Sequence, residues 1–269
     1  MNPMKTRPNC KINLGLKVLR KRSDGYHDLA TVFLPVPICD ELEITPLSDS
    51  QCDCEMCQTG ITVDCPPDDN LCVKAYRLLK ADYPHIPAVR IVLQKNIPFG
   101  AGLGGGSSDC AFTLSMLNEM FALGLTNTQL KRYAVRLGAD CPFFIDNVPA
   151  YATGIGDQLT SLTFNPVEGL RVVVEKPHDA VSTREAYAGI RLSDSANADR
   201  YDNPATSPLL QALHAPIDTW RDTIVNDFET TVFPAHPAIA ALKQKFYDQG
   251  ALYAAMSGSG AAVFALFPK

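Results

Sequence analysis

The residues with the clearest chemical signature form a glycine-rich segment, PFGAGLGGGSS, at positions 98–108. The segment follows a predicted strand at 89–93 and precedes a predicted helix, where exposed N–H groups and the helix dipole favour a phosphate. Glycine permits the positive φ values that turn successive amides toward one anion, and its lack of a side chain lets phosphates come close. A purely structural turn needs fewer glycines, so we predict that this loop binds the phosphates of a nucleotide. The predicted contacts are Pro98, Phe99, Gly100, Ala101, Gly102, Leu103, Gly104, Gly105, Gly106, Ser107 and Ser108.

Two better-known phosphate-binding folds do not fit this loop. The segment contains G-x-G-x-x-G through Gly100, Gly102 and Gly105, as dinucleotide-binding folds do. Such folds need a second strand that ends in an acidic residue about 20 positions beyond the motif, whereas we predict another helix here. A P-loop is also disfavoured, because no Lys-Ser or Lys-Thr pair follows the glycines.

Two further charged residues are candidates for chemistry, although each has a simple structural interpretation. The segment KINLGLKV at 11–18 alternates apolar and polar residues, which predicts a half-buried strand with Lys11 and Asn13 on its polar face. A polar strand face is usually just solvated. Asp140 follows a predicted helix that stops at Gly138, and its carboxylate could simply interact with the start of the next helix.

The elements that must position these residues do not alternate as strand and helix. We predict helices over 109–121, 126–137 and 238–249, a strand from Leu170, an exposed loop over 193–207, and two short strands that flank residues 256–260. Thr126 with Gln129 predicts a capping box at the second of these helices. Without a regular βαβα order, two α+β domains are favoured over a doubly wound sheet, and we divide the chain into 1–155 and 156–269.

Composition excludes several classes of protein. The chain has 269 residues, 46% of them hydrophobic, and a net charge of −5, so it lacks the basic surface expected of a nucleic-acid-binding protein. No apolar run is long enough for a membrane span, and the first residues do not resemble a signal peptide. Nine cysteines, an odd number, favour a reducing compartment, and we predict a cytoplasmic protein. The spacing of Cys52, Cys54, Cys57 and Cys65 matches no usual zinc site, and we predict no metal there.

Five segments in order along the chain resemble the superfamily of galactokinase, homoserine kinase, mevalonate kinase and phosphomevalonate kinase, the GHMP kinases. They are PNCKINLGL from Pro8, RSDGYHDL from Arg22, the glycine loop, GADCPFF from Gly138, and MSGSGAAVFALF from Met256. The triple glycine before the serine pair resembles the diphosphocytidyl-methylerythritol kinase branch. The resemblance implies an N-terminal domain like domain 2 of ribosomal protein S5, a ferredoxin-like C-terminal domain, and a small-molecule substrate with a cytidine diphosphate group, bound between them. It implies ATP and Mg²⁺ as cofactors, and phosphorylation of the 2-hydroxyl of the methylerythritol unit in the non-mevalonate isoprenoid pathway.

The resemblance also implies roles for single residues. Lys11 and Asp140 match the catalytic pair, in which the carboxylate takes the proton of the attacking hydroxyl and the ammonium stabilises the transferring phosphoryl group. Tyr26 and His27 match positions that bind the cytosine, whereas Asn13 and Thr183, with Asp140, match positions near the methylerythritol. Lys95 matches a position near the nucleotide base, and Ser108 a magnesium contact, although Ser108 also suits a helix N-cap.

Two features depart from this branch, and two other functions stay open. Asp109 stands where the family usually has a small or neutral residue, and a carboxylate there could repel ATP. The relatives also usually continue past the position of Lys269, through another helix and strand. A homoserine or mevalonate type of kinase would not need the DGYH segment, because its substrate has no cytosine. A non-catalytic ligand sensor would not need both Lys11 and Asp140.

Overall fold

The computed structural model describes residues 2–48, 52–62, 66–190, 192 and 195–269, which form two compact units. Unit 1 comprises Met1–Cys10, Pro37–Phe99 and Gly104–Asn147, and unit 2 comprises Lys11–Val36, Gly100–Leu103 and Val148–Lys269. Each unit is therefore assembled from segments that are far apart in the sequence. The glycine loop contributes residues to both units.

Unit 1 is built on a four-stranded sheet in the order β1-β4-β6-β5. The strands are β1 (Met4–Thr6), β4 (Glu41–Pro46), β5 (Cys54–Gly60) and β6 (Val89–Lys95). The pairs β1–β4 and β4–β6 are antiparallel, and β5–β6 is parallel. In β6, Ile91 and Leu93 are buried while Arg90 and Gln94 are exposed, so this strand turns one face to the core.

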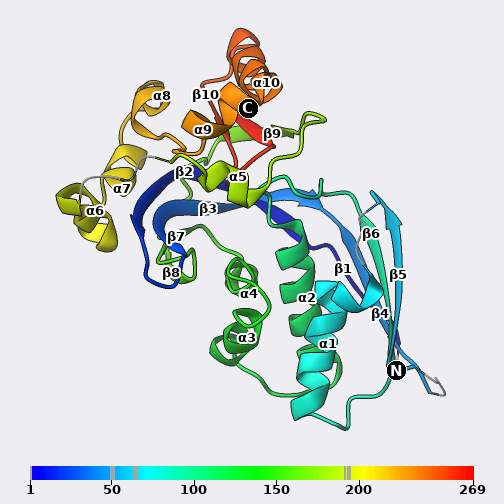
Figure 1. Ribbon diagram of the computed structural model, residues 1–269. Coiled ribbons are helices and arrows are strands. Elements are labelled where there is room, and N and C mark those ends of the chain that lie inside the picture. Colours follow the sequence, from blue (N-terminus) through cyan, green and yellow to red (C-terminus); the bar gives the residue numbers. More distant parts are fainter. Residues whose placement is uncertain (1, 49–51, 63–65, 191, 193–194) are drawn as a thin grey trace. The chain divides into compact units, whose positions relative to one another are not determined.

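Helices cover the inner face of this sheet, with α1 and α2 side by side (Figure 1). Tyr76 of α1, Ile91 of β6 and Leu114 of α2 are fully buried in the shared core. Thr126 and Gln129 form the predicted capping box at the start of α3. The helical elements of unit 1 are η1 (Pro67–Asp69), α1 (Leu71–Asp82), α2 (Gly105–Met120), α3 (Asn127–Ala134) and α4 (Phe143–Asp146).

Unit 2 contains two sheets. One has the order β2-β3-β7-β8, and the other has the order β10-β11-β9 with antiparallel pairing. Phe228, Phe246 and Met256 belong to a buried cluster that joins helices α9 and α10 to strand β10. The strands are β2 (Asn9–Lys21), β3 (His27–Cys39), β7 (Ala150–Thr153), β8 (Gln158–Ser161), β9 (Leu170–Glu175), β10 (Tyr253–Met256) and β11 (Val263–Pro268). The helical elements are α5 (Thr183–Tyr187), α6 (Ser195–Asp202), η2 (Pro204–Thr206), α7 (Pro208–Leu213), η3 (Ile217–Thr219), α8 (Trp220–Thr223), α9 (Glu229–Ala235) and α10 (Pro237–Asp248).

The structure confirms the α+β class and corrects two local predictions. The predicted exposed loop over 193–207 was wrong, because helix α6 occupies Ser195–Asp202. The strand predicted at 11–18 is confirmed as part of β2, but its half-burial was wrong, since Lys11 and Asn13 are only 3% and 2% exposed. The division of the chain at residue 155 stays a prediction. Among the described residues, no helix is long and apolar enough to cross a membrane.

Candidate functional site

The glycine loop has the backbone conformation that its composition predicts. Gly100, Gly102 and Gly104 all have positive φ, at 60°, 73° and 70°. At Gly102 a side chain is also excluded by contact, because a Cβ atom there would lie 2.0 Å from the carbonyl oxygen of Ser257. Glycine is therefore required at Gly102 both by conformation and by the close approach of another backbone.

Within unit 2, the middle of the loop is bound on two sides. The backbone N–H of Lys11 donates to the carbonyl of Leu103 at 2.9 Å, and that of Ala262 donates to the carbonyl of Ala101 at 3.2 Å. The hydroxyl of Ser257 donates to the carbonyl of Gly102 at 3.0 Å. Strand β2 and the segment between β10 and β11 thus hold residues 101–103 in place.

The ammonium group of Lys11 is fixed on this loop. Its Nζ donates to Oδ1 of Asn13 at 2.6 Å and to the carbonyl of Gly102 at 3.0 Å, and it lies 4.9 Å from the centre of the Phe33 ring. Asn13 is oriented in turn, because its Nδ2 donates to the hydroxyl of Thr31 at 3.1 Å. The structure therefore joins Lys11, Asn13 and Gly102 in one buried network and gives a buried cation a defined position.

The turn that carries Asp140 packs beside the first turn of α2, within unit 1. Ser107 hydrogen-bonds to the thiol of Cys141, whose pKa is lowered chiefly by its hydrogen bond with Cys110 and further by Ser107. A Cβ atom on Gly138 would lie 3.9 Å from the hydroxyl oxygen of Ser107. The backbone carbonyl of Asp140 accepts from the N–H of Phe143 at 3.3 Å, at the start of α4. Asp140 is therefore held close to the C-terminal end of the glycine loop.

Ser108 has an unusual environment for a serine. The residue is fully buried, and its hydroxyl oxygen has no hydrogen-bond partner in the described structure. Buried polar groups normally have a partner, so an orphaned hydroxyl at the phosphate loop fits the role of a ligand to a hard cation such as Mg²⁺. Among the described residues, no group of three or more His, Cys, Asp or Glu side chains is placed to hold a metal by itself. Cys65, from the cysteine cluster, lies outside the described residues.

Tyr26 ends the turn between β2 and β3, and His27 is the first residue of β3. Tyr26 is 62% exposed, whereas the ring of His27 stacks on Tyr187 with centroids 4.6 Å apart and planes 20° apart. Burial, and to a lesser extent Lys21, lowers the pKa of His27, which keeps the imidazole neutral at physiological pH. Tyr187 was missed in the sequence, because an aromatic residue in a short helical stretch carries no distinctive signal.

Helix α5 connects this aromatic pair to the loop network. Its first residue, Thr183, has its hydroxyl 3.4 Å from that of Ser259, and its last residue is Tyr187. Ser259 belongs to the MSGSG segment, whose Ser257 accepts from the backbone N–H of Asn13 at 3.2 Å. Asn13, Thr183 and His27 of unit 2 are therefore linked. Asn13 and Thr183 both contact the MSGSG segment, and Thr183 shares helix α5 with Tyr187, on which His27 stacks.

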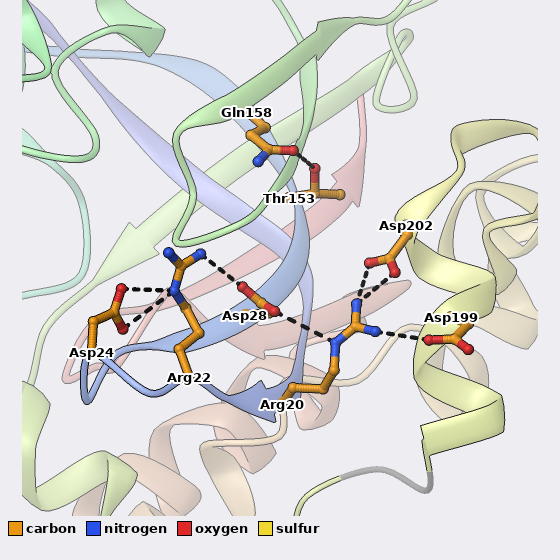
Figure 2. Close-up of polar contacts among 8 residues, drawn as sticks. All are labelled: Arg20, Arg22, Asp24, Asp28, Thr153, Gln158, Asp199 and Asp202. Carbon is orange, nitrogen blue, oxygen red and sulfur yellow. Dashed lines mark hydrogen bonds and ion pairs between the residues drawn. The ribbon is translucent and has the colours of Figure 1, made fainter.

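An exposed ion-pair network supports the same turn (Figure 2). Arg22 pairs with Asp24 at 3.0 Å and with Asp28 at 3.2 Å, and Asp24 also accepts from the backbone N–H of Tyr26 at 3.0 Å. Asp28 reaches Arg20 as well, at 3.5 Å. Arg20 continues the network to helix α6, through the carboxylates of Asp199 and Asp202 at 2.7 and 2.5 Å.

In contrast to the exposed ion pairs of this turn, Lys95 is buried. Its Nζ pairs with Asp40 and, at 2.7 Å, with Asp109, and all three side chains are at most 5% exposed. The carboxylate of Asp109 therefore has a cationic partner. Beside this group is a cavity of about 190 Å³. Its lining includes Asn70, Leu71, Lys95, Phe99, Gly106 and Asp109.

The chain matches two protein-family models along its sequence. Residues 70–155 match the N-terminal domain of GHMP kinases, and residues 209–269 match their C-terminal domain. The chain therefore belongs to the GHMP kinases, a family of small-molecule kinases, as the glycine loop and the motifs around Lys11 and Asp140 predicted.

Its relatives place it more narrowly. It is 47% identical over 268 residues to the 4-diphosphocytidyl-2-C-methyl-D-erythritol kinase of Bacteroides fragilis, covering 98% of this chain and 92% of that protein. A crystal structure of 4-(cytidine 5'-diphospho)-2C-methyl-D-erythritol kinase is 32% identical with a TM-score of 0.78, and the match covers 98% of this chain and 90% of that one. The mevalonate kinase of Methanococcus jannaschii, at 11% identity and a TM-score of 0.71 over 98% and 90% of the two chains, shares the fold. The chain belongs to the family of 4-diphosphocytidyl-2-C-methyl-D-erythritol kinases.

Proposed function

We propose that this protein transfers the γ-phosphoryl group of ATP to the 2-hydroxyl of 4-diphosphocytidyl-2-C-methyl-D-erythritol, as a step of the non-mevalonate isoprenoid pathway. The observation that carries the proposal is the position of Lys11, whose buried ammonium is hydrogen-bonded to the carbonyl of Gly102 in the glycine loop. A cation fixed on a phosphate-binding loop suits phosphoryl transfer, where catalysis consists mainly of positioning and charge stabilisation. The reducing environment favoured by the cysteine content supports a cytoplasmic location.

In the proposed reaction the substrate oxygen forms a bond to the γ-phosphorus while the bond from that phosphorus to the β–γ bridging oxygen breaks. Asp140 accepts the proton of the attacking hydroxyl, and ADP leaves with the bridging oxygen. Lys11 stabilises the negative charge of the transferring group, and Asn13 keeps the ammonium oriented through its 2.6 Å hydrogen bond. Asn13 and Thr183 bind the methylerythritol portion.

The nucleotide is assigned to the glycine loop and to the neighbouring cavity of unit 1. Residues 98–108 hold the phosphates through backbone N–H groups, and the base enters the space that Asn70, Phe99 and Lys95 border. The hydroxyl of Ser108 would be the protein ligand of Mg²⁺. Bound there, Mg²⁺ would neutralise part of the phosphate charge during transfer.

A coupled assay of ADP release tests the substrate. We expect turnover with 4-diphosphocytidyl-2-C-methyl-D-erythritol and none with homoserine or mevalonate. Turnover of homoserine or mevalonate alone would overturn the assignment.

The role of Asp140 is tested by Asp140→Asn, for which we expect turnover to fall by roughly 10²-fold or more with little change in ATP affinity, because the carboxylate acts in the chemical step. Asp146→Asn is the matched control, since it removes a carboxylate that is ion-paired to Lys131 in the same unit. Unchanged turnover in Asp140→Asn would remove Asp140 from the mechanism.

The cytosine site is tested by the base of the substrate. A pocket that hydrogen-bonds cytosine is expected to prefer the cytidine to the uridine substrate by ~10⁴ in kcat/KM, because the wrong base leaves buried polar groups unpaired. His27→Ala should abolish the preference. His214→Ala removes a ring whose centroid lies 4.5 Å from that of Phe164 in the same unit, and this variant should retain the preference. A wild-type ratio near one would show that the turn at Tyr26 and His27 does not read the base.

A further inference from the structure

Asp40 holds the residues that directly precede the glycine loop. This side chain is completely buried between β3 and β4. Its Oδ1 accepts from the backbone N–H groups of Asn96 and Ile97 at 2.5 and 2.8 Å, and its Oδ2 accepts from Lys95. One carboxylate thus fixes three consecutive residues where β6 ends and the loop begins.

The first residue after the loop is bound to the same lysine. Asp109, directly after Ser108 on α2, accepts from the ammonium of Lys95 at 2.7 Å. Gly105 packs closely on this group, because a Cβ atom there would lie 2.9 Å from Cγ2 of Ile97 and 3.4 Å from Nζ of Lys95. Asp40, Lys95 and Asp109, which we call the loop clasp, therefore join the two ends of the glycine loop.

The clasp contains more carboxylates than cations. Two buried carboxylates share one ammonium, and Oδ1 of Asp109 has no hydrogen-bond partner in the described structure. Burial raises the pKa of Asp109 to about 7, with Lys95 opposing the rise and Asp40 adding to it. Asp109 in turn contributes to the raised pKa values of the thiols of Cys72 on α1 and Cys110 on its own helix.

We propose that Asp40 and Asp109 are positioning residues for the nucleotide, which hold both ends of the glycine loop through Lys95. This inference rests on the proposed binding of ATP at the glycine loop. A loop whose two ends are already fixed loses less conformational freedom when the phosphates bind, so the clasp favours nucleotide binding.

Asp109→Asn and Asp109→Ala test the contact to Lys95. Asparagine keeps an oxygen that accepts from Lys95, so its affinity for Mg-ADP should match that of the wild type. Alanine removes the contact, so it should raise the Kd of Mg-ADP about tenfold or more.

Titration of Mg-ADP by calorimetry measures these affinities. Asp40→Ala releases the backbone N–H groups of Asn96 and Ile97, so it should weaken binding as Asp109→Ala does. Glu55→Gln, which removes an exposed ion pair to Arg90 in the same unit, is the control and should match the wild type.

The outcomes distinguish this inference from the proposed function. If Asp109→Ala, folded by circular dichroism, binds Mg-ADP as the wild type does, the positioning role is wrong. If Asp109→Asn binds as weakly as Asp109→Ala, the contact to Lys95 is not what holds the loop, and the inference is also wrong. Failure of the wild type to bind Mg-ADP or Mg-ATP at any pH would overturn the proposed function itself, and this inference with it.

Discussion

The loop clasp of unit 1 and the ion-pair network of the Tyr26 turn in unit 2 use the same chemical groups in opposite surroundings. Both contain more carboxylates than cations: two to one in the clasp, and Asp24, Asp28, Asp199 and Asp202 to Arg20 and Arg22 at the turn. The clasp side chains are at most 5% exposed, whereas those of the turn are 24–69% exposed.

The difference shows that burial, rather than the number of ion pairs, decides what an imbalance of charge does. Water screens the excess acid at the turn, where the pKa of Asp24 is even lowered, chiefly by the backbone N–H of Tyr26. In the clasp the side chains are buried, and burial, with Asp40 adding to its effect, raises the pKa of Asp109 to about 7. The clasp therefore contains a carboxyl group with a raised pKa, whereas the ion-pair network of the turn supports a surface turn.

The largest expected effect comes from breaking the clasp. Lys95→Met leaves two buried carboxylates without their cation, and removing one partner from a buried ion pair costs about 3–5 kcal/mol. We expect a loss of this size in the free energy of unfolding, measured by urea denaturation at pH 8. A loss below about 1 kcal/mol would mean that the clasp is not energetically different from the turn.

The next effect concerns the pH dependence of stability. The folded pKa of Asp109, about 7, lies above the ordinary value of 3.8, so between these pH values the folded state keeps a proton that the unfolded chain releases. The contribution of Asp109 to stability is therefore present below about pH 4 and is lost as the pH rises to about 7.

Urea denaturation from pH 4 to 8 measures this effect. The free energy of unfolding of the wild type, relative to Asp109→Asn, should fall across the window by up to roughly 4 kcal/mol. Parallel curves for the two proteins would contradict the raised pKa.

The smallest effect is expected at the turn. Arg20→Met removes exposed ion pairs, which contribute about 1 kcal/mol or less, so the stability should change little. Because Arg20 joins the turn to α6, we expect KM for the cytidyl substrate to rise a few-fold with kcat unchanged. Lys245→Met, which removes a similarly exposed pair with Glu175, is the control. A stability loss as large as that of Lys95→Met would remove the distinction between the two regions.

Local patterns in the sequence predicted the elements well, and contacts between distant residues account for what they missed. The glycine loop, the capping box at Thr126 and the strand from Leu170 were confirmed because each depends on near neighbours in the chain. The burial of Lys11 and Asn13 was not visible, since Gly102, Thr31 and Ser257 cover that face of β2. Helix α6 was missed because SANADRYD lacks an apolar period.

The candidate site shows the same division. Its motifs predicted the glycine loop, Lys11 with Asp140, and the segment at Tyr26 and His27, and the roles of these residues stay predictions. Their partners were not predictable. The cation that pairs with Asp109 precedes it by 14 residues, and Asp40 lies 55 residues before that lysine. Tyr187 reaches His27 only because α5 and the β2–β3 turn meet in unit 2.

The contact between Gly102 and Ser257 has a consequence for protein engineering. The two backbones lie so close together that Gly102 has no room for a methyl group. The phosphate loop therefore depends on contacts outside its own residues. A graft of residues 98–108 alone into another scaffold would lack the surface that shapes its middle. Transplanting the loop, or recombining halves of related enzymes, requires moving the MSGSG segment with it, although 155 residues separate the two in the chain.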